Sequence, residues 1–180
     1  MEDKKEQIVQ TFEKHFKHHG FKKTSVDDIA AELQISKKTI YKYFNSKEKI
    51  FYFIISRVAK GLSKKTEKKL AGFSTYEEKI VQLINQIFEE TRKWLQKGND
   101  AFEFKYKYEI SELAFKEAYN EIIRKWIQEG IKNQEFQSVN IELIVRFING
   151  LFSESMKLVS ANPELRIEEE VRNAVLKLLK

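Results

Sequence analysis

The fold of this chain is decided by the stretch Ser36-Lys37-Lys38-Thr39-Ile40-Tyr41-Lys42-Tyr43-Phe44. With the preceding residues from Thr24 onward, it has the apolar spacing of two short helices that pack across a tight turn. Ser25 and Ser36 each stand where a helix could begin, because a serine side chain accepts a hydrogen bond from the free amides of a first helical turn. The stretch therefore predicts a helix-turn-helix.

The positive charge of the chain is concentrated in its first third. Five lysines and one acidic residue, Glu48, lie between Ser36 and Lys49. Residues 1–60 carry 13 Lys and Arg against 8 Asp and Glu, whereas the remaining residues carry 20 against 19. This distribution is typical of a nucleic-acid-binding domain joined to a second domain with another task. A solvated basic face without a partner is the alternative interpretation.

Composition predicts an all-α protein of one large or two small domains. Of the 180 residues, 42% are hydrophobic and 33% charged, with one proline and six glycines, which excludes low-complexity disorder and favours amphipathic helices. Cysteine is absent, so disulfides, thiolate metal sites and thiol nucleophiles are excluded. Because the first residues lack the apolar core of a signal peptide and no apolar run is long enough to cross a bilayer, we expect a cytoplasmic protein that does not enter the membrane.

Apolar periodicity predicts about nine helices. The expected helices span residues 4–19, closed by Gly20, then 26–33, a short one after Ser36, a long fourth one through Gly61, one that begins at a Ser74/Glu77 capping box, and later ones over 110–131, 139–160 and the tail. Residues 102–108 alternate aromatic and charged side chains, the pattern of a strand, but the helical context favours a short irregular helix or turn. Gly150 within a helix indicates a close contact with another helix.

The first 55 or so residues resemble the TetR family of transcriptional regulators. The resemblance rests on Gly20-Phe21, the run from Thr24 to Ala30, the run from Ile35 to Phe44, and Ser46-Lys47-Glu48. It implies a helix-turn-helix DNA-binding domain over residues 1–48 and a ligand-binding and dimerisation domain over 49–180. One departure is Gln34, which stands where the family usually has glycine; in a left-handed conformation Gln34 carries a strain of about 1 kcal/mol.

The resemblance also implies the DNA-binding residues. Lys37, Lys38 and Thr39 open the recognition helix, where side chains reach base edges. Tyr41, Lys42 and Tyr43 follow on the same element, and Tyr41 and Lys47 resemble phosphate contacts. Thr24 and Ser25 suit either a phosphate or the cap of the second helix. Tyr43 suits the core and the DNA equally, whereas Phe44 belongs in the core.

The expected partners are double-stranded DNA with a near-palindromic operator, a small effector, and a second copy bound through the last two helices. Seven side chains indicate a pocket for an apolar or aromatic effector: Leu62, Phe88, Phe104, Tyr108, Phe115, Tyr119 and Phe152. An ordinary hydrophobic core would explain the same residues equally well. The predicted function is a ligand-responsive, sequence-specific transcriptional regulator, a repressor that its effector releases from DNA. An all-α module that binds a protein through its helix-turn-helix is the alternative.

Catalytic and metal-binding motifs are missing from the sequence. It contains no Gly-rich phosphate loop, no HExxH and no GxSxG, so we expect no enzyme and no cofactor. His15 and His19 lie one helical turn apart, a spacing that can chelate a metal, but no third ligand is identifiable. Their place near a helix C-terminus is explained by the helix dipole, and no metal site is predicted.

Overall fold

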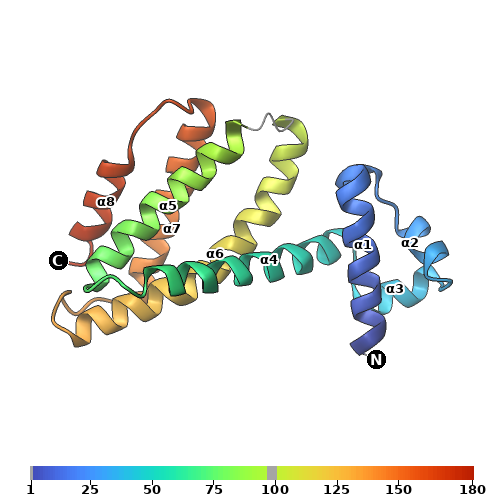
Figure 1. Ribbon diagram of the computed structural model, residues 1–180, viewed down its shortest axis with the longest axis horizontal. Helices are drawn as coiled ribbons and strands as arrows, with labels where there is room; N and C mark the ends of the chain where they lie inside the picture. Colours follow the sequence, from blue (N-terminus) through green and yellow to red (C-terminus); the bar gives the residue numbers. More distant parts are fainter. Residues whose placement is uncertain (1, 97–100) are drawn as a thin grey trace. The chain divides into compact units, whose positions relative to one another are not determined.

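The computed structural model describes residues 2–96 and 101–180, and the side chains of residues 3–93 and 110–180. The described residues form eight α-helices and no strand, so the predicted all-α fold is confirmed (Figure 1). The helices are α1 (Glu2–Lys23), α2 (Val26–Glu32), α3 (Lys37–Tyr43), α4 (Lys47–Leu70), α5 (Tyr76–Gln96), α6 (Ala101–Lys132), α7 (Ile141–Ala161) and α8 (Glu168–Lys177).

The chain divides into two compact units, Met1–Val58 and Ala59–Lys180. Helix α4 supplies residues to both of them. The predicted boundary between the DNA-binding domain and the ligand-binding domain, after residue 48, remains a prediction.

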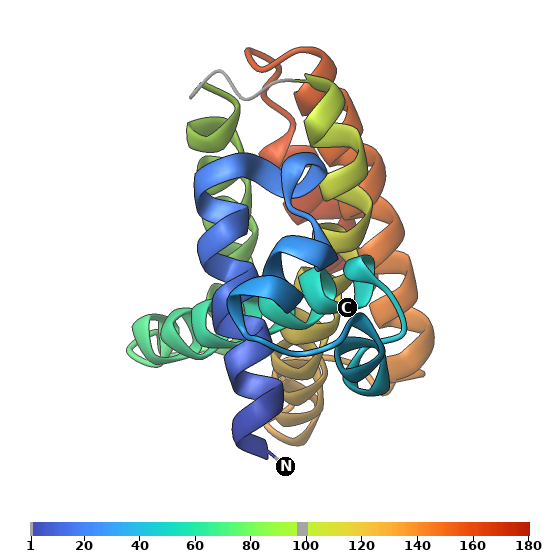
Figure 2. The ribbon, with the colours of Figure 1, turned by 90° about the vertical axis from the view of Figure 1, so that its right-hand side faces the viewer.

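The first unit contains α1, α2, α3 and the first half of α4 (Figure 2). Its core consists of apolar side chains that are at most 1% exposed: Ile8, Val9, Phe12, Ile29, Ile40, Ile50 and Phe51. The ring centroid of Phe51 lies 4.9 Å from that of Phe16 and 5.1 Å from that of Phe21. Arg57 on α4 donates two hydrogen bonds, of 2.7 and 2.8 Å, to the Glu6 carboxylate on α1. Both an apolar core and an ion pair therefore connect α1 with α4.

Two residues with positive φ end the helices of this unit. Gly20 has φ 77° and ψ 167° and breaks α1 there, as the sequence predicts. Gln34 has φ 52°, so the left-handed conformation foreseen for this position is present. The Gln34 amide donates to the Ala31 carbonyl (3.1 Å) and the Ile35 amide to the Ala30 carbonyl (2.9 Å), the two bonds of a Schellman motif. The helix-turn-helix turn is thus intact despite the side chain at Gln34.

The second unit is a helical bundle in which α5 packs on α6, α7 and α8 (Figure 1). Its largest fully buried side chains are Phe88, Leu83, Ile84, Ile127 and Leu179. Val171 and Val175 on the apolar face of α8, and Leu179 just after the helix, are buried in the same core. The tail helix therefore has a packing partner within its own chain.

Two sequence-based expectations about this unit are wrong in detail. Residues 102–108 belong to α6, because its helical backbone begins at Ala101 and continues through them; this merger leaves eight described helices where about nine were expected. The capping box of α5 lies one residue later than predicted: the Glu78 amide donates to Thr75 Oγ1 (3.1 Å), and Glu78 Oε2 accepts from the Thr75 amide (3.2 Å). Near the end of α4, the polar residues Ser63 and Thr66 are buried.

The expected close contact at Gly150 is not made within the described part of the chain. A Cβ atom built at Gly150 has no heavy atom within 4 Å outside the backbone of its own helix. A Cβ atom built at Gly130 comes within 2.3 Å of the Phe136 ring. A side chain at Gly130 on α6 would therefore collide with the ring of Phe136 in the α6–α7 connection.

No helix among the described residues combines the length and the apolar character that crossing a bilayer requires.

Replacing Gln34 with glycine is expected to stabilise the protein by about 0.5–1 kcal/mol, because glycine adopts φ 52° without the strain of a side chain. Urea unfolding of both proteins measures the difference. The matched control is Gln128→Gly, at an exposed position within α6, which is expected to destabilise by about 1 kcal/mol. A destabilised Gln34→Gly variant would contradict the strain.

Candidate nucleic-acid interface

The start of α3 is fixed by Ser36 and by an ion pair to α2. Ser36 Oγ accepts a hydrogen bond from the Thr39 amide (3.1 Å) and lies 2.9 Å from Thr39 Oγ1. Lys37 Nζ lies 2.6 Å from Asp27 Oδ1, with both side chains largely exposed. The first turn of α3 is therefore ordered by its own hydroxyl groups, and Lys37 spans the gap to α2.

The outer face of α3 is basic and aromatic. Lys38, Tyr41 and Lys42 are exposed, and three to four residues separate Tyr41 and Lys42 from Lys38, so the three side chains share one face of the helix. Ile40 is 0% exposed and holds the opposite face in the core. The helix thus presents two cations and a phenol to solvent while its inner face is anchored.

The other predicted residues on α3 and its borders are less exposed. Tyr43 is half-buried, which leaves both of its interpretations open, whereas Phe44 is buried as predicted. Thr24 is only 2% exposed, and its hydroxyl donates to the Gly20 carbonyl (2.7 Å). Ser25 is the N-cap of α2 and accepts from the Asp27 amide (3.0 Å). The side chains of Thr24 and Ser25 therefore act first on the backbone, and a DNA contact of either one remains a prediction.

Lys47 points into the first unit. Its Nζ donates to the carbonyl oxygens of Phe21 (2.5 Å) and Thr24 (2.9 Å). Burial lowers the pKa of Lys47 below its usual value, and the neighbouring Glu48 opposes this effect. Its predicted phosphate contact would have to compete with these bonds.

The predicted effector-binding residues that have a described side chain differ widely in burial. Phe88 is fully buried, and its ring centroid lies 6.2 Å from that of the half-buried Phe152. Phe115 and Tyr119 stack with centroids 6.4 Å apart, and Leu62 is 42% exposed. The side chains of two further predicted residues, Phe104 and Tyr108, lie outside the described ones.

A buried polar group joins three helices of the second unit, and two of its members were not predicted from the sequence. Gln86 Nε2 on α5 donates to Thr66 Oγ1 on α4 (3.2 Å), which lies 3.3 Å from the Tyr119 hydroxyl on α6. Thr66 is 3% exposed. Thr66 lies in the polar run of residues 63–69, which gave no signal of burial, and Gln86 lies to one side of the apolar stripe of α5.

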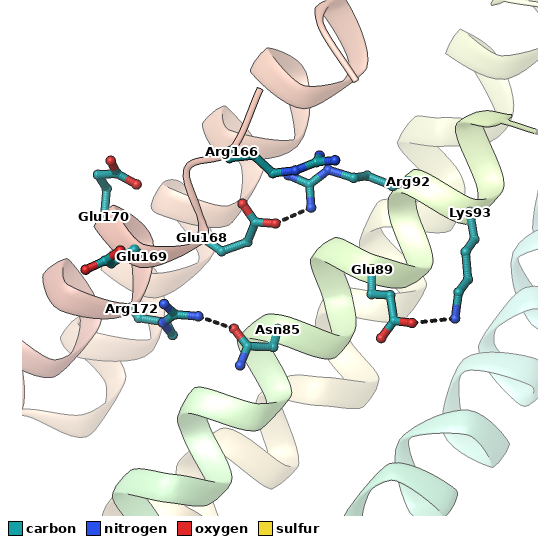
Figure 3. Close-up of a pocket in the computed structure, with 9 residues that line it drawn as sticks. All are labelled: Asn85, Glu89, Arg92, Lys93, Arg166, Glu168, Glu169, Glu170 and Arg172. Carbon is teal, nitrogen blue, oxygen red and sulfur yellow. Dashed lines mark hydrogen bonds and ion pairs between the residues drawn. The ribbon is translucent and has the colours of Figure 1, made fainter. Parts of the chain in front are cut away.

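Two grooves lie on the second unit. The larger, of about 650 Å³, runs between α5 and the start of α8 and is lined by four cationic and four acidic side chains (Figure 3). Arg92 pairs there with Glu168 and donates to the Leu165 carbonyl (2.7 Å), and Arg172 donates to Asn85 Oδ1 (2.5 Å). The hydrogen bond from Arg92 lowers the pKa of Glu168. The ion pair and hydrogen bonds in this groove hold the α7–α8 connector on α5. The charged lining of the groove does not suit an apolar effector.

The smaller groove lies on α7 and α8 and is mostly apolar. It measures about 470 Å³ and is lined by Arg146, Phe147, Gly150, Leu151, Ala174 and Leu178. Phe147 is 49% exposed, and two other apolar side chains of α7, Leu143 and Leu158, are 46% and 55% exposed. None of the predicted effector-binding residues with a described side chain lines either groove.

One histidine of α1, His15, contacts a carboxylate on α2. His15 Nε2 lies 2.6 Å from Glu32 Oε2, and Lys14 Nζ lies 2.9 Å from Glu32 Oε1. Within the described residues no three His, Cys, Asp or Glu side chains gather in a way that could hold a metal ion.

Known proteins share both the motif and the fold. Residues 8–52 match the family model for bacterial regulatory proteins of the tetR family. YhgD, an uncharacterized HTH-type transcriptional regulator of Bacillus subtilis (strain 168), is 26% identical over 148 residues, which are 78% of this chain and 76% of YhgD.

Two solved structures illustrate the common fold. RolR in complex with resorcinol has a TM-score of 0.73 at 11% identity and covers 99% of this chain and 88% of RolR. FadR from Bacillus subtilis in complex with stearoyl-CoA has a TM-score of 0.55 at 21% identity and covers 96% of this chain and 95% of FadR.

A helix-turn-helix with a bare basic face, joined to a helical bundle, defines a transcriptional regulator of the helix-turn-helix class. The first unit of the chain carries the helix-turn-helix of the TetR family of bacterial regulatory proteins. Its relatives are regulators of transcription and not enzymes, in agreement with the prediction from sequence.

Proposed function

We propose that the protein is a homodimeric repressor that binds a near-palindromic operator through α3 and leaves it when a small apolar or aromatic effector binds the second unit. The observation that carries the DNA-binding part is the exposed face of α3, where Lys38, Tyr41 and Lys42 lie opposite the buried Ile40. A helix of this kind fits the major groove, and lysines on it neutralise phosphates or reach base edges. In a dimer two such helices contact half-sites about 34 Å apart, or a multiple of that distance.

The specificity of this interface rests on few direct contacts. Lysine offers a point charge and no planar fork, so it distinguishes bases less well than arginine does. Lys37, Lys38 and Thr39 at the start of α3 are the candidates for base contacts, and Lys37 would exchange its ion pair with Asp27 for the DNA. DNA shape supplies the remaining selectivity.

The effector part is supported by the second unit and by the relatives. RolR and FadR were crystallised with resorcinol and with stearoyl-CoA, an aromatic and a long-chain ligand. In this chain the buried group of Thr66, Gln86 and Tyr119 joins α4 to α5 and α6. A ligand that contacts this group changes the attachment of α4, the helix that continues into the DNA-binding unit. It releases DNA only to the extent that it binds the DNA-free conformation more tightly.

The dimer part is supported by the apolar groove on α7 and α8. A row of exposed apolar side chains, Leu143, Phe147 and Leu158, follows one side of α7, and Gly150 leaves room beside it. A second copy would cover this face and form a four-helix interface from two α7 and two α8 helices.

Binding to a duplex taken from the region upstream of the protein's own coding sequence is expected to be sequence-selective and to weaken with salt. The Lys42→Ala variant is expected to lower the slope of log K against log salt concentration by about 0.9, because it neutralises one phosphate fewer. Fluorescence anisotropy between about 50 and 200 mM salt measures the slope.

The control for this titration is Lys132→Ala, which removes one exposed lysine from α6 and should leave the slope unchanged. If the wild-type protein forms no salt-sensitive complex, the alternative of a protein-binding helix-turn-helix is favoured.

Replacing Phe147 with glutamate is expected to give monomers at micromolar concentrations where the wild type is dimeric, because it buries a charge in an apolar interface. Sedimentation velocity measures the assembly. Phe73→Glu, at an exposed phenylalanine in the α4–α5 turn, is the matched control and should remain dimeric. A dimeric Phe147→Glu variant would place the interface elsewhere.

The Tyr119→Phe variant is expected to bind operator DNA as the wild type does but to need a roughly three- to tenfold higher effector concentration for release, the effect of one lost neutral hydrogen bond. The probes are resorcinol and stearoyl-CoA, added to the preformed complex and followed by anisotropy. Tyr76→Phe, at a tyrosine outside the polar group, is the control. Equal release of both variants would exclude the Tyr119 hydroxyl from effector binding.

A further inference from the structure

Lys47 is the first residue of α4, and its ammonium group is surrounded by backbone carbonyls. Nζ lies 2.5 Å from the Phe21 oxygen, 2.9 Å from the Thr24 oxygen and 3.4 Å from the Lys22 oxygen. It also lies 4.3 Å from the centroid of the Phe21 ring, a cation–π distance. An ammonium group has three N–H donors, and three acceptors face it here.

These carbonyls come together because of the break in α1. Gly20, with φ 77°, ends the regular helix, and the chain makes one further turn through Lys23 before Ser25 opens α2. Carbonyl oxygens near a helix C-terminus lack helical partners and form the negative end of the helix dipole. A cation that arrives from another helix at this point satisfies these oxygens and holds the connector at the same time.

The connector is also anchored to the core on its other side. Phe21 is 4% exposed, and its ring lies 5.1 Å from the Phe51 ring of α4. Thr24 is 2% exposed and bonded to Gly20. Lys47 therefore joins two segments that are both fixed, so its ammonium position is determined by the fold.

We propose that Lys47 is a positioning residue that ties the α1–α2 connector to the start of α4, and that it contributes to DNA binding through the geometry of the helix-turn-helix and not by neutralising a phosphate. The proposal rests on the proposed DNA-binding function. It assigns to Lys47 a different role from the exposed lysines of α3, whose charge faces solvent. The lowered pKa of Lys47, caused by its burial, agrees with this assignment.

The first experiment uses the free wild-type protein labelled with ¹⁵N in its lysine side chains. The ammonium group of Lys47 is expected to give a sharp NMR signal because hydrogen bonds to three carbonyls slow its exchange with water, whereas the exposed Lys42 ammonium should be broadened by exchange. Equally fast exchange of Lys47 and Lys42 would overturn the proposal. This measurement requires neither DNA nor a variant that folds.

The second experiment compares Lys47→Met with Lys42→Met, two variants that remove one charge and keep an aliphatic stem. Binding to the upstream duplex is measured from about 50 to 200 mM salt, at a temperature where circular dichroism shows each variant fully folded. Lys42→Met is expected to lower the slope by about 0.9. Lys47→Met is expected to weaken binding about tenfold at every salt concentration with an unchanged slope, since charge-assisted bonds that order the motif are lost.

The outcomes separate the two hypotheses. A slope lowered by about 0.9 in Lys47→Met, or binding as tight as that of the wild type, would overturn the positioning role. If the wild-type protein does not bind the duplex at any salt concentration, the proposed function fails, and the NMR experiment still decides whether Lys47 is tied to the connector.

Discussion

Helices α2 and α3 contain seven residues each, which is too few for a helix to persist in water by itself. They exist because their inner faces are buried: Ile29 and Ile40 are both 0% exposed in the core of the first unit. The solvent-facing side of α3 therefore depends on a packing constraint on its opposite side. The Schellman bonds around Gln34 and the cap at Ser36 fix the angle between the two helices, and the burial of Ile29 and Ile40 keeps them together.

This constraint also explains why lysines of one short region have different roles. Side chains on the outer face of α3, such as Lys38 and Lys42, can only point into solvent, because the inner face is occupied by core residues. Lys47 stands after the turn at Phe44, where the chain has changed direction, and it faces the end of α1. The five lysines lie within fourteen residues of the sequence. In the folded protein they do not all lie on one basic surface.

The sequence predicted the elements of this fold well where apolar residues recur with helical spacing, as in α5 and α7, and where a special residue marks an end, as at Gly20. It was wrong where two signals competed. Residues 102–108 were expected to form a short irregular helix or turn, because a lone strand would leave its backbone unpaired, but they form the beginning of the long helix α6. The cap of α5 is formed by Thr75 and Glu78 although Ser74 and Glu77 have the same spacing, and only the start of the helix distinguishes them.

For the residues of the candidate site, exposure to solvent could be predicted from the sequence, but contacts with residues far away in the sequence could not. Exposure on α3 follows from the helical period, so Lys38, Tyr41 and Lys42 were foreseen as solvent-facing. The environment of Lys47 depends on the carbonyls of Phe21 and Thr24, more than twenty residues earlier, and no local pattern encodes such a contact. The same holds for Thr66, whose hydroxyl is paired with Gln86 and Tyr119 on two other helices.

The polar group around Thr66 suits a regulator better than a uniform apolar core would. Apolar packing is close to the density of a crystal and offers a small ligand little to exchange. A buried hydroxyl, in contrast, needs a hydrogen-bond partner. A ligand can replace one partner by another that forms a hydrogen bond of similar strength. Because Thr66 lies on α4, a change of its partner acts on the helix that also carries Lys47 and Phe51 in the first unit. The free energy available for such coupling is the difference between two sets of hydrogen bonds, which is small, so a response would require that the two conformations of α4 be nearly balanced beforehand.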